Sequence, residues 1–385
     1  MLTPCCCEPR QTRNQAGTGE NARASIERFF MHILHVVGAR PNFMKAAPVL
    51  RALATETSIR QTLVHTGQHY DAGMSDVFFQ QLGMPAPDMN LSVGSGSHAQ
   101  QTAEVMARFE PVALDQKPDR VVVYGDVNST VAAAMVCAKL CIPVAHVEAG
   151  LRSRDRTMPE EINRLVTDQL SDWLFTPSTD ADANLLREGI SPEKIHCVGN
   201  VMIDTLVRLS PHAVLPADLA ALGPFALVTL HRPANVDDLP WLKEMLAALL
   251  EVGHELPVVF PVHPRTRQRM TEAGFLPAED GRLRLLPPVP YLEFLALQKA
   301  ARVVVTDSGG IQEETSYLGI PCLTVRENTE RPITLTSGTN TLVGRDIQRF
   351  QKELQRVLAS PAPPPRTIPL WDGHASERIA KILLS

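Results

Sequence analysis

Short apolar runs alternate along the chain with longer amphipathic stretches, and each run has the length of a buried strand. A first series of predicted strands covers 32–37, 61–66, 120–125, 142–147, 172–177 and 195–200. A second series covers 225–230, 257–262, 283–288, 301–307 and 321–326. Apolar strands separated by helices indicate parallel sheets that are covered on both faces. The pattern therefore predicts an α/β protein of two doubly wound, Rossmann-like domains.

Changes in composition suggest where the domains begin and end. Residues 1–30 are polar and lack periodicity, so we expect a disordered leader there. We expect the first domain over 31–200 and the second over 201–365. The stretch 201–222, which includes a run rich in Pro and Ala, is the predicted join. A C-terminal helix over 366–385 is expected to pack back on the first domain.

Composition and charge exclude several classes of protein. The net charge of the 385-residue chain is −5 and no basic block stands out, which disfavours a nucleic-acid partner. The apolar runs are too short to span a bilayer. The seven cysteines do not form a disulfide framework, so we expect a reducing, cytoplasmic setting. Three of them, Cys5, Cys6 and Cys7, are adjacent, but no second ligand cluster lies nearby, and we expect no metal.

Acidic side chains gather after two predicted strands of the first domain. The stretch 146–164, HVEAGLRSRDRTMPEEINR, packs Asp and Glu among arginines directly after an apolar run. Asp126 follows one strand and Glu148 follows the next, with one helix between them. Because the carboxyl ends of parallel strands face the same crevice, both acids are expected to reach it. A helix cap for Asp126 and an ordinary surface position for Glu148 stay open as alternatives.

Local signals predict how these acids are held. Gly125 permits a tight turn after its strand, and Ser129 is expected to cap the following helix. Glu160 and Glu161 follow Pro159, so they are expected in the first turn of a helix, where the helix dipole favours acids. One of the two glutamates could have only that role. The arginines nearby could balance the charge and fix the acids in place.

Two strand-to-helix turns have the composition of anion-binding sites. In the first, Gly38 bends the chain, Arg40 stands at the strand tip, and Lys45 lies near the start of the helix. Solvated charges are the alternative interpretation there. In the second domain, the loop 308–310 (Ser-Gly-Gly) starts a helix after a buried strand. Its two glycines would let a phosphate approach backbone N–H groups.

Other polar residues are expected at the same crevice. Glu314 lies one turn into the helix after the Ser-Gly-Gly loop, where its charge would repel phosphate, so a ribose diol is the more compatible partner. Arg331 follows the next strand and could reach the same ligand. His231 closes the strand 225–230 and is expected to face the interdomain cleft, although an isolated histidine is more often structural. His263 has a similar position at a strand end and a weaker case.

One pattern is misleading. The segment VGSGSHA has the glycine spacing of a loose dinucleotide-binding fingerprint. It does not follow a strong strand, and it is not in the first strand-to-helix turn. We interpret it as a polar loop with a helix cap at Ser97, and no nicotinamide cofactor is expected.

Eight short segments together resemble the non-hydrolysing UDP-N-acetylglucosamine 2-epimerases. They are GARPNFMK, TGQHYD, YGDVNST, HVEAGLRS, MPEEINR, TLHRPAN, PVHPRT and one longer stretch that begins with TDSGGIQEE and ends with ENTERP. The resemblance runs from Met31 to the C-terminus in the same order and spacing, and residues 1–30 have no counterpart. It implies the glycosyltransferase-B architecture, with the site between the two domains and UDP bound by the second. It also implies interconversion of UDP-N-acetylglucosamine and UDP-N-acetylmannosamine by anti elimination of UDP, a bound glycal intermediate and re-addition.

The resemblance also implies roles for individual positions. The catalytic set is Asp126, Glu148, Glu160 and His231, without an assignment of each carboxylate to one face of the sugar. The phosphate-binding set is Arg40, Lys45, Ser308, Gly309, Gly310 and Arg331. Glu314 resembles the ribose ligand, and Val289 and Phe294 match positions that contact the uracil. Gln68, His69, Arg232 and His263 are similar to a second, regulatory sugar-nucleotide site.

What the resemblance implies about partners is limited. It implies a cytoplasmic homodimer that needs no cofactor and no metal, with a second UDP-N-acetylglucosamine as an allosteric activator. Membranes and nucleic acids are not expected as partners.

Four alternatives stay open from the sequence. The chain could act on a related UDP-2,3-diacetamido uronic acid sugar, since enzymes of that kind share TGQH, YGD and MPEEINR. It could be a hydrolysing epimerase, which releases the free sugar. A glycosyltransferase of the same architecture would have little use for acids around C2. A sugar-nucleotide sensor on this scaffold could lose Asp126, Glu148 or Glu160, yet all three are present.

Overall fold

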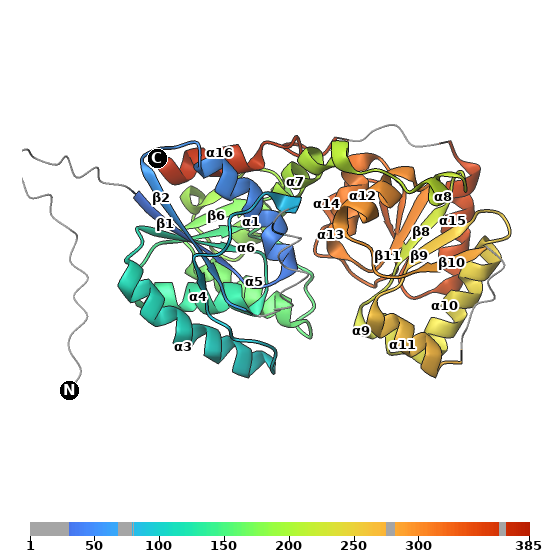
Figure 1. Cartoon of the computed structure of the whole chain (residues 1–385), viewed down its shortest axis with the longest axis horizontal. Coiled ribbons are helices and arrows are strands. Elements are labelled where there is room, and N and C mark those ends of the chain that lie inside the picture. The colour runs from blue at the N-terminus through green and yellow to red at the C-terminus, as the bar shows by residue number, and fades with distance from the viewer. Residues whose placement is uncertain (1–30, 68–78, 80, 275–281, 362–366) are drawn as a thin grey trace, which may run out of the picture.

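Two parallel sheets lie side by side, each flanked by helices (Figure 1). The computed structural model describes residues 31–67, 79, 81–274, 282–361 and 367–385. The predicted α/β class with two doubly wound sheets is confirmed. Both sheets are wholly parallel, and their central strands, such as Met31–Val37 and Val303–Thr306, are short apolar runs that are buried on both faces.

The first sheet has the strand order β3-β2-β1-β4-β5-β6-β7. Its strands are β1 Met31–Val37, β2 Ile59–His65, β3 Met89–Asn90, β4 Arg120–Tyr124, β5 Val144–Val147, β6 Trp173–Thr176 and β7 Ile195–Cys197. Its main helices are α1 Arg40–Leu53, α3 His98–Gln116, α4 Asn128–Lys139, α5 Pro159–Leu170, α6 Thr179–Arg187 and α7 Val201–Leu209. One apolar core joins this sheet to α1 and α7, and another joins it to α3 and α4. We call this unit the first domain.

The second sheet has the strand order β10-β9-β8-β11-β12-β13. Its strands are β8 Ala226–Thr229, β9 Val258–Pro261, β10 Leu283–Leu286, β11 Val303–Thr306, β12 Cys322–Thr324 and β13 Asn340–Leu342. Its helices are α8 Ala217–Ala220, α9 Pro233–Val236, α10 Leu239–Val252, α11 Pro264–Glu272, α12 Tyr291–Ala300, α13 Gly309–Leu318, α14 Ile333–Thr336 and α15 Ile347–Ala359. We call this unit the second domain. Strand β13 lies beyond the predicted series because three residues are too few to give a periodic signal.

The last helix, α16 (Ala375–Leu384), lies against α1 and α7 of the first domain (Figure 1). Its apolar face, which includes Ile379 and Leu383, joins the core of that domain. The predicted helix over 366–385 was too long at its start. Pro369 disfavours a helix before it, and Gly373 has a φ of +86°, which is outside the helical region.

The order of the strands directs attention to one edge of each sheet. In the first sheet the order in which strands are added reverses between β1 and β4, and in the second it reverses between β8 and β11. At such a reversal the helices leave the two strands on opposite faces, which opens a crevice at the carboxyl ends. The turns after β4 and β11 contain Asp126 and Ser308, two of the predicted site residues.

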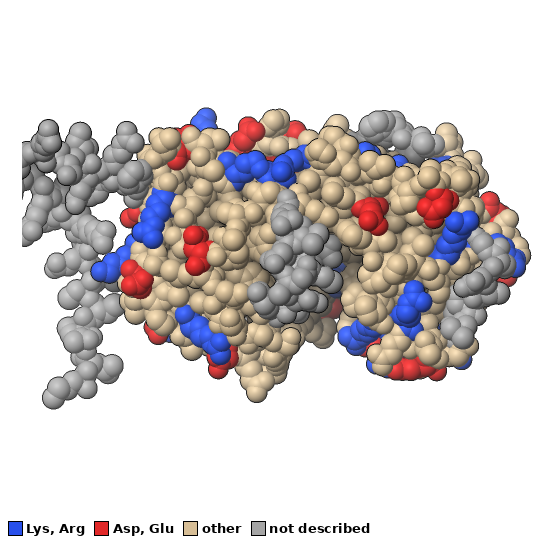
Figure 2. All heavy atoms as spheres, viewed as in Figure 1, with Lys and Arg blue, Asp and Glu red and all other residues tan. Residues whose placement is uncertain are grey.

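Within the described part of the chain, no helix is both long and apolar enough to cross a bilayer. On the face drawn in Figure 2, lysines and arginines are scattered over both domains among acidic side chains rather than gathered in one broad patch.

Candidate active site

A cavity of about 440 Å³ lies between the two domains, at the carboxyl ends of the strands. Half of the predicted site residues line it. They are Lys45, His231, His263, Val289, Phe294, Ser308, Gly310, Glu314 and Arg331. Asp126, Glu148 and Glu160 do not line this cavity directly. Glu148 is linked to it through ion pairs with Lys45 and Arg331, which do.

The first strand-to-helix turn brings Lys45 to the centre of the site. Helix α1 begins at Arg40, because Pro41 suits the first turn of a helix. Lys45 is therefore in the second turn, where it is 5 % exposed and forms an ion pair with Glu148. A Cβ atom at Gly125 would lie 2.6 Å from Lys45 Nζ. Gly125 thus has two roles, the tight turn that its φ of +62° requires and the space for this ammonium. The side chain of Arg40 is not described.

Glu148 of the first domain forms an ion pair with the second domain. It follows β5 with a φ of +72°, in the left-handed region that non-glycine residues seldom adopt. Its side chain is buried, and Oε1 accepts a hydrogen bond of 2.8 Å from Nη2 of Arg331 in the second domain. A strained, buried acid held between two cations is typical of a functional position rather than of an ordinary surface residue.

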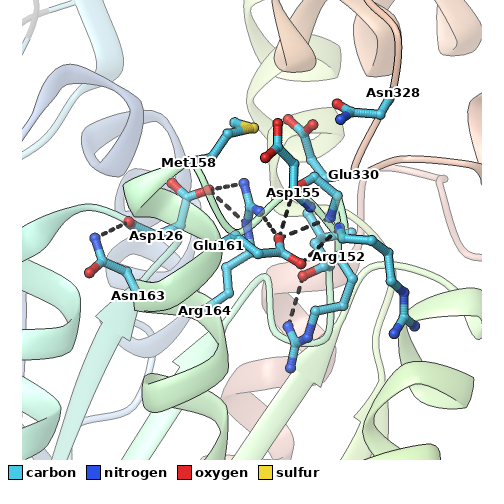
Figure 3. A network of polar contacts seen from close by, with 12 residues as sticks. Asp126, Arg152, Asp155, Met158, Glu161, Asn163, Arg164, Asn328 and Glu330 are labelled. Carbon is cyan, nitrogen blue, oxygen red and sulfur yellow. Dashed lines mark hydrogen bonds and ion pairs between the residues drawn. The ribbon is translucent and has the colours of Figure 1, made fainter.

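Asp126 and Glu161 are held by one arginine of the first domain. Arg164 donates to Asp126 from Nε at 3.0 Å and from Nη2 at 2.7 Å, and its Nη1 pairs with Glu161 (Figure 3). Burial pushes the pKa of Asp126 up, but the cations around it, Arg164 first, hold that pKa below its ordinary value. Asp126 is therefore a carboxylate at neutral pH. Ser129 does not cap α4 as expected, since Val127 occupies the N-cap position and the Ser129 hydroxyl contacts Thr66.

Glu160 and Glu161 are neighbours with different surroundings. Both lie in the first turn of α5, as predicted. Glu161 is buried and accepts hydrogen bonds from the backbone N–H groups of Ser153 and Arg154, so it fixes the loop before the helix. Glu160 is half-buried and makes no hydrogen bond or ion pair with the described residues; its charge acts on nearby Arg232. Glu160 is the glutamate of the pair that remains available for chemistry.

A buried histidine ties together the two turns that carry the candidate acids. His146 Nε2 lies 2.7 Å from the carbonyl oxygen of Gly125, and Nδ1 lies 2.7 Å from Asp168. Asp168 also accepts from the N–H of Gly150 and pairs with Arg152. Burial alone would raise the pKa of Asp168, but the His146 hydrogen bond and the Arg152 charge bring it below its ordinary value. Both partners of His146 are therefore acceptors, so both ring nitrogens donate.

Arg331 is surrounded by three carboxylates. Its Nη2 binds Glu148, its Nε lies 2.7 Å from Glu313, and its Nη1 pairs with Glu330. Burial alone would lower the pKa of Arg331, but the three carboxylates raise it. Glu330 is also bound by Arg326 at 2.8 Å. Any phosphate at this arginine would have to share it with these acids.

The two glycines of the Ser-Gly-Gly loop differ. A Cβ atom at Gly309 would lie 2.4 Å from Arg331 Nη1 and 2.6 Å from Glu330. At Gly310 it would meet nothing within 4 Å. Both glycines were expected to make room for a phosphate. Only Gly310 faces open space at the cavity, whereas Gly309 makes room for the side chains packed against it.

Glu314 and the apolar residues form another part of the cavity wall. Val289 and Phe294 line it together with Tyr291. Glu314 is buried, and its carboxylate accepts hydrogen bonds from Tyr291 and Gln298. Burial raises its pKa. A carboxylate beside an apolar wall suits a nucleoside, whose base needs apolar contacts and whose ribose offers hydroxyl donors.

His231 and Arg232 are positioned by a buried aspartate. Asp307 accepts hydrogen bonds from both of their backbone N–H groups, at 3.1 Å and 2.9 Å, and from the side chain of Asn235. The His231 ring stays about two-fifths exposed at the cavity, 3.1 Å from Asp307. Arg232 lies 3.8 Å from Met158 in the first domain. Among the predicted regulatory residues, His263 caps α11 beside His231, and Gln68 and His69 lie outside the described residues.

Sequence reasoning missed five residues of this network. They are His146, Asp307, Glu313, Glu330 and Arg164 as a direct partner of Asp126. A signal existed for Glu313, because it lies four residues after Gly309 and therefore on the same helix face. No comparable signal existed for Asp307, whose partners are 72 to 76 positions away. No cluster of metal-ligating side chains occurs in the part of the chain described here.

Comparisons with known proteins agree with this arrangement. The family model described as UDP-N-acetylglucosamine 2-epimerase matches residues 51–384. A relative of that name from Methanocaldococcus jannaschii is 41% identical over 92% of this chain and 99% of its own. A solved structure of the Methanocaldococcus jannaschii enzyme with UDP-GlcNAc and UDP has a TM-score of 0.84 at 41% identity, covering 92% of this chain and 99% of that one. A Pseudomonas aeruginosa relative, UDP-2,3-diacetamido-2,3-dideoxy-D-glucuronate 2-epimerase, is 43% identical with the same coverage.

Proposed function

The chain belongs to the UDP-N-acetylglucosamine 2-epimerase family, and we propose that it interconverts UDP-N-acetylglucosamine and UDP-N-acetylmannosamine. The observation that carries this proposal is the meeting of Glu148 with Arg331 across the cleft. It places an acid at a strand tip of the first domain against a cation of the second, beside the Ser308–Gly310 loop. Inversion at C2 with departure of UDP from C1 needs such acids and such cations around one sugar.

The acidic groups would move the proton at C2. The proton leaves from one face and returns on the other, so the reaction needs groups on both sides of the ring. Asp126, Glu148, Glu160 and His231 are the candidates. Asp126 is held as a carboxylate, which suits a base, and Glu160 has no hydrogen-bond or ion-pair partner among the described residues.

The cationic groups would hold the departing diphosphate. Lys45 and Arg331 supply positive charge, and the backbone of the Ser308–Gly310 loop supplies N–H donors at the start of α13. Such preorganised donors stabilise the charge that develops on UDP as the C1–O bond breaks. We propose that Arg40 also contributes to diphosphate binding, as its position in the family motif implies.

The nucleoside would lie at the other end of the cavity. Val289 and Phe294 are apolar and line that wall, so we assign them to the uracil. Glu314 is assigned to the ribose hydroxyls, beside Tyr291 and Gln298. This orientation directs the sugar toward Glu148 and Lys45, because the diphosphate then extends along the Ser308–Gly310 loop.

A second candidate substrate has comparable support. The Pseudomonas aeruginosa relative named for UDP-2,3-diacetamido-2,3-dideoxy-D-glucuronate is slightly more identical to this chain than the Methanocaldococcus jannaschii relative named for UDP-N-acetylglucosamine. We favour the N-acetylglucosamine substrate because a solved structure of a relative holds UDP-GlcNAc and UDP in this fold. The same acid and diphosphate chemistry would serve either sugar.

Three further properties follow from family membership as proposals. We infer a homodimer in the cytoplasm, and a regulatory sugar-nucleotide site that includes Gln68, His69, Arg232 and His263. In the described part of this site, Arg232 contacts Met158 across the cleft, so a ligand there would act on the relative position of the domains.

The experiment that tests the proposal is a pair of reactions followed by proton NMR. Purified protein is incubated separately with UDP-N-acetylglucosamine and with UDP-2,3-diacetamido-2,3-dideoxyglucuronate. We expect the anomeric signal of UDP-N-acetylmannosamine in the first reaction, and slower or no conversion in the second. Conversion of the second sugar alone would move the assignment to the diacetamido substrate. Release of free N-acetylmannosamine would mean hydrolysis, and no conversion of either sugar would refute the epimerase.

A further inference from the structure

Glu313 is a buried carboxylate that the proposed roles leave without a task. It lines the cavity on α13, one residue before the proposed ribose ligand, and it is 1 % exposed. We propose that Glu313 takes up a proton when a UDP-sugar binds and, as a neutral acid, donates a hydrogen bond to the diphosphate. The inference rests on the proposed function, because it assigns a further group to the same site.

The distribution of partners around Arg331 singles out Glu313 among the three acids. Glu148 is also paired with Lys45, and Glu330 is also bound by Arg326. Glu313 makes no ion pair with a second cation among the described residues. Its Oε1 forms an ion pair with Nε of Arg331, and its Oε2 has no hydrogen-bond or ion-pair partner among the described residues. A buried carboxylate oxygen without a partner is costly, and a proton or a ligand removes that cost.

The surroundings of Glu313 also favour its neutral form. Burial raises its pKa to about 7, against the opposing charge of Arg331, and the Glu148 carboxylate adds to the rise. Lys45 is the second cation that acts on it. The other titratable groups at the cavity and around Arg331 are Glu314, Glu330, His231 and His263.

A bound diphosphate would raise the pKa of Glu313 further. Three carboxylates already share Arg331, and UDP adds further negative charge beside them. A negative charge near a carboxylate raises its pKa, and Glu313 is the acid of the three that makes no ion pair with a second cation among the described residues. The protonated Oε2 can then donate to a phosphate oxygen. That hydrogen bond strengthens as UDP departs and its charge grows.

The direct test is calorimetric titration of the full-length protein with UDP-N-acetylglucosamine at pH 8, in two buffers with different ionisation enthalpies. The diphosphate diester of this probe does not titrate near neutrality, so any proton taken up goes to the protein. We expect an uptake of about one proton and an affinity that falls about tenfold per pH unit above pH 7. Binding without proton uptake would overturn the inference and leave the proposed function intact. If the chain instead prefers the diacetamido sugar, the same titration uses that sugar.

Two variants locate the proton. Glu313→Gln should abolish the uptake and flatten the pH dependence of affinity, because its amide cannot take up the proton. Glu330→Gln is the matched control, since it removes another acid of Arg331 and should leave the uptake unchanged. Uptake that persists in Glu313→Gln would place the proton elsewhere and contradict the inference. If that variant does not fold, the pH dependence of wild-type affinity decides. Failure of the wild type to bind any UDP-sugar would instead refute the proposed function itself.

Discussion

Two arginines organise the site, and they do so in different ways. Arg164 binds Asp126 and Glu161, and all three residues belong to the first domain. Arg331 binds three carboxylates, and one of them, Glu148, comes from the other domain. The Arg164 cluster can form as soon as the first domain folds. The Arg331 cluster needs both domains in place.

The difference suggests a division of labour. A cluster within one domain fixes the geometry of the acids before substrate arrives. A cluster that spans the cleft, as the Arg331 cluster does, responds to the charge of what binds there. We infer that Arg164 sets positions, whereas Arg331 couples domain contact to the diphosphate. Each prediction below tests one side of this comparison.

The largest effect is expected from loss of Arg331. Arg331→Met leaves three buried carboxylates without their shared cation, which should lower the free energy of unfolding by about 3–5 kcal/mol. Denaturant unfolding measures it. Arg356→Met is the control, because the Arg356 pair with Glu353 is solvent-exposed and should cost less than about 1 kcal/mol. Equal costs for the two variants would mean that the acids at Arg331 are not held by its charge.

The next largest effect concerns chemistry. Glu148→Gln and Glu160→Gln should each reduce turnover at least roughly 100-fold, about 2.7 kcal/mol, while UDP still binds, because each removes a proton-transfer group and leaves the diphosphate cations. Steady-state kinetics and UDP titration measure the two properties. Near-normal turnover in both variants would overturn the catalytic assignment.

Glu161→Gln is the matched neighbour of Glu160→Gln. Glu161 accepts two backbone hydrogen bonds and forms an ion pair with Arg164, so its replacement should lower the free energy of unfolding by about 1–3 kcal/mol. Half-buried Glu160 makes none of these contacts, and Glu160→Gln should change stability by less than about 0.5 kcal/mol. Thermal or denaturant unfolding of both variants checks the contrast. A reversed order would mean that the two glutamates have exchanged roles.

The pH dependence of stability should also distinguish the two clusters. The folded-state pKa of Glu313, about 7, lies above its ordinary value of 4.5. Its contribution to the free energy of unfolding is therefore complete below pH 4.5 and is lost as the pH rises through 7. Asp126 has a lowered pKa, so its contribution to the free energy of unfolding is lost only in acid. From pH 5 to 8, the wild type should therefore lose on the order of 2 kcal/mol relative to Glu313→Gln. Parallel stability curves would contradict this.

The smallest effect separates adjacent glycines. Gly309→Ala places a Cβ atom against Arg331 and should cost about 1–2 kcal/mol of stability. Gly310→Ala meets no neighbour and should leave stability nearly unchanged, while it weakens UDP binding if a phosphate lies at this turn. Unfolding and UDP titration of the pair measure both effects. Equal destabilisation would contradict the separate functions assigned to the glycines.

The sequence was sufficient for the fold because parallel sheets leave a strong pattern. Apolar runs such as the predicted strand 301–307, which alternate with helices, indicate strands buried on both faces, and the rule for carboxyl ends then brings Asp126 and Ser308 to the crevices. Short elements such as β13 escaped prediction because three residues carry no period. The start of α16 was misplaced because the helical pattern was extended back through Pro369 and Gly373.

Contacts between side chains were less predictable than positions. The Lys45–Glu148–Arg331 chain joins residues from three distant segments, and no local spacing encodes it. The arginines of 146–164 looked equivalent, but Arg164 alone among them binds Asp126, whereas Arg152 pairs with Asp168 and Glu188. Gly309 looked like a phosphate-binding glycine, because a sequence does not reveal which side chain fills the space beside it.

The most direct measurement of the central claim is the fate of the C2 hydrogen. The protein is incubated with UDP-N-acetylglucosamine in D₂O, and proton NMR follows the C2 position of both epimers. If acids at the tips of the first sheet remove this proton while cations of the second domain hold UDP, deuterium appears at C2 as UDP-N-acetylmannosamine forms. Epimer formation with the original C2 hydrogen retained would contradict the account.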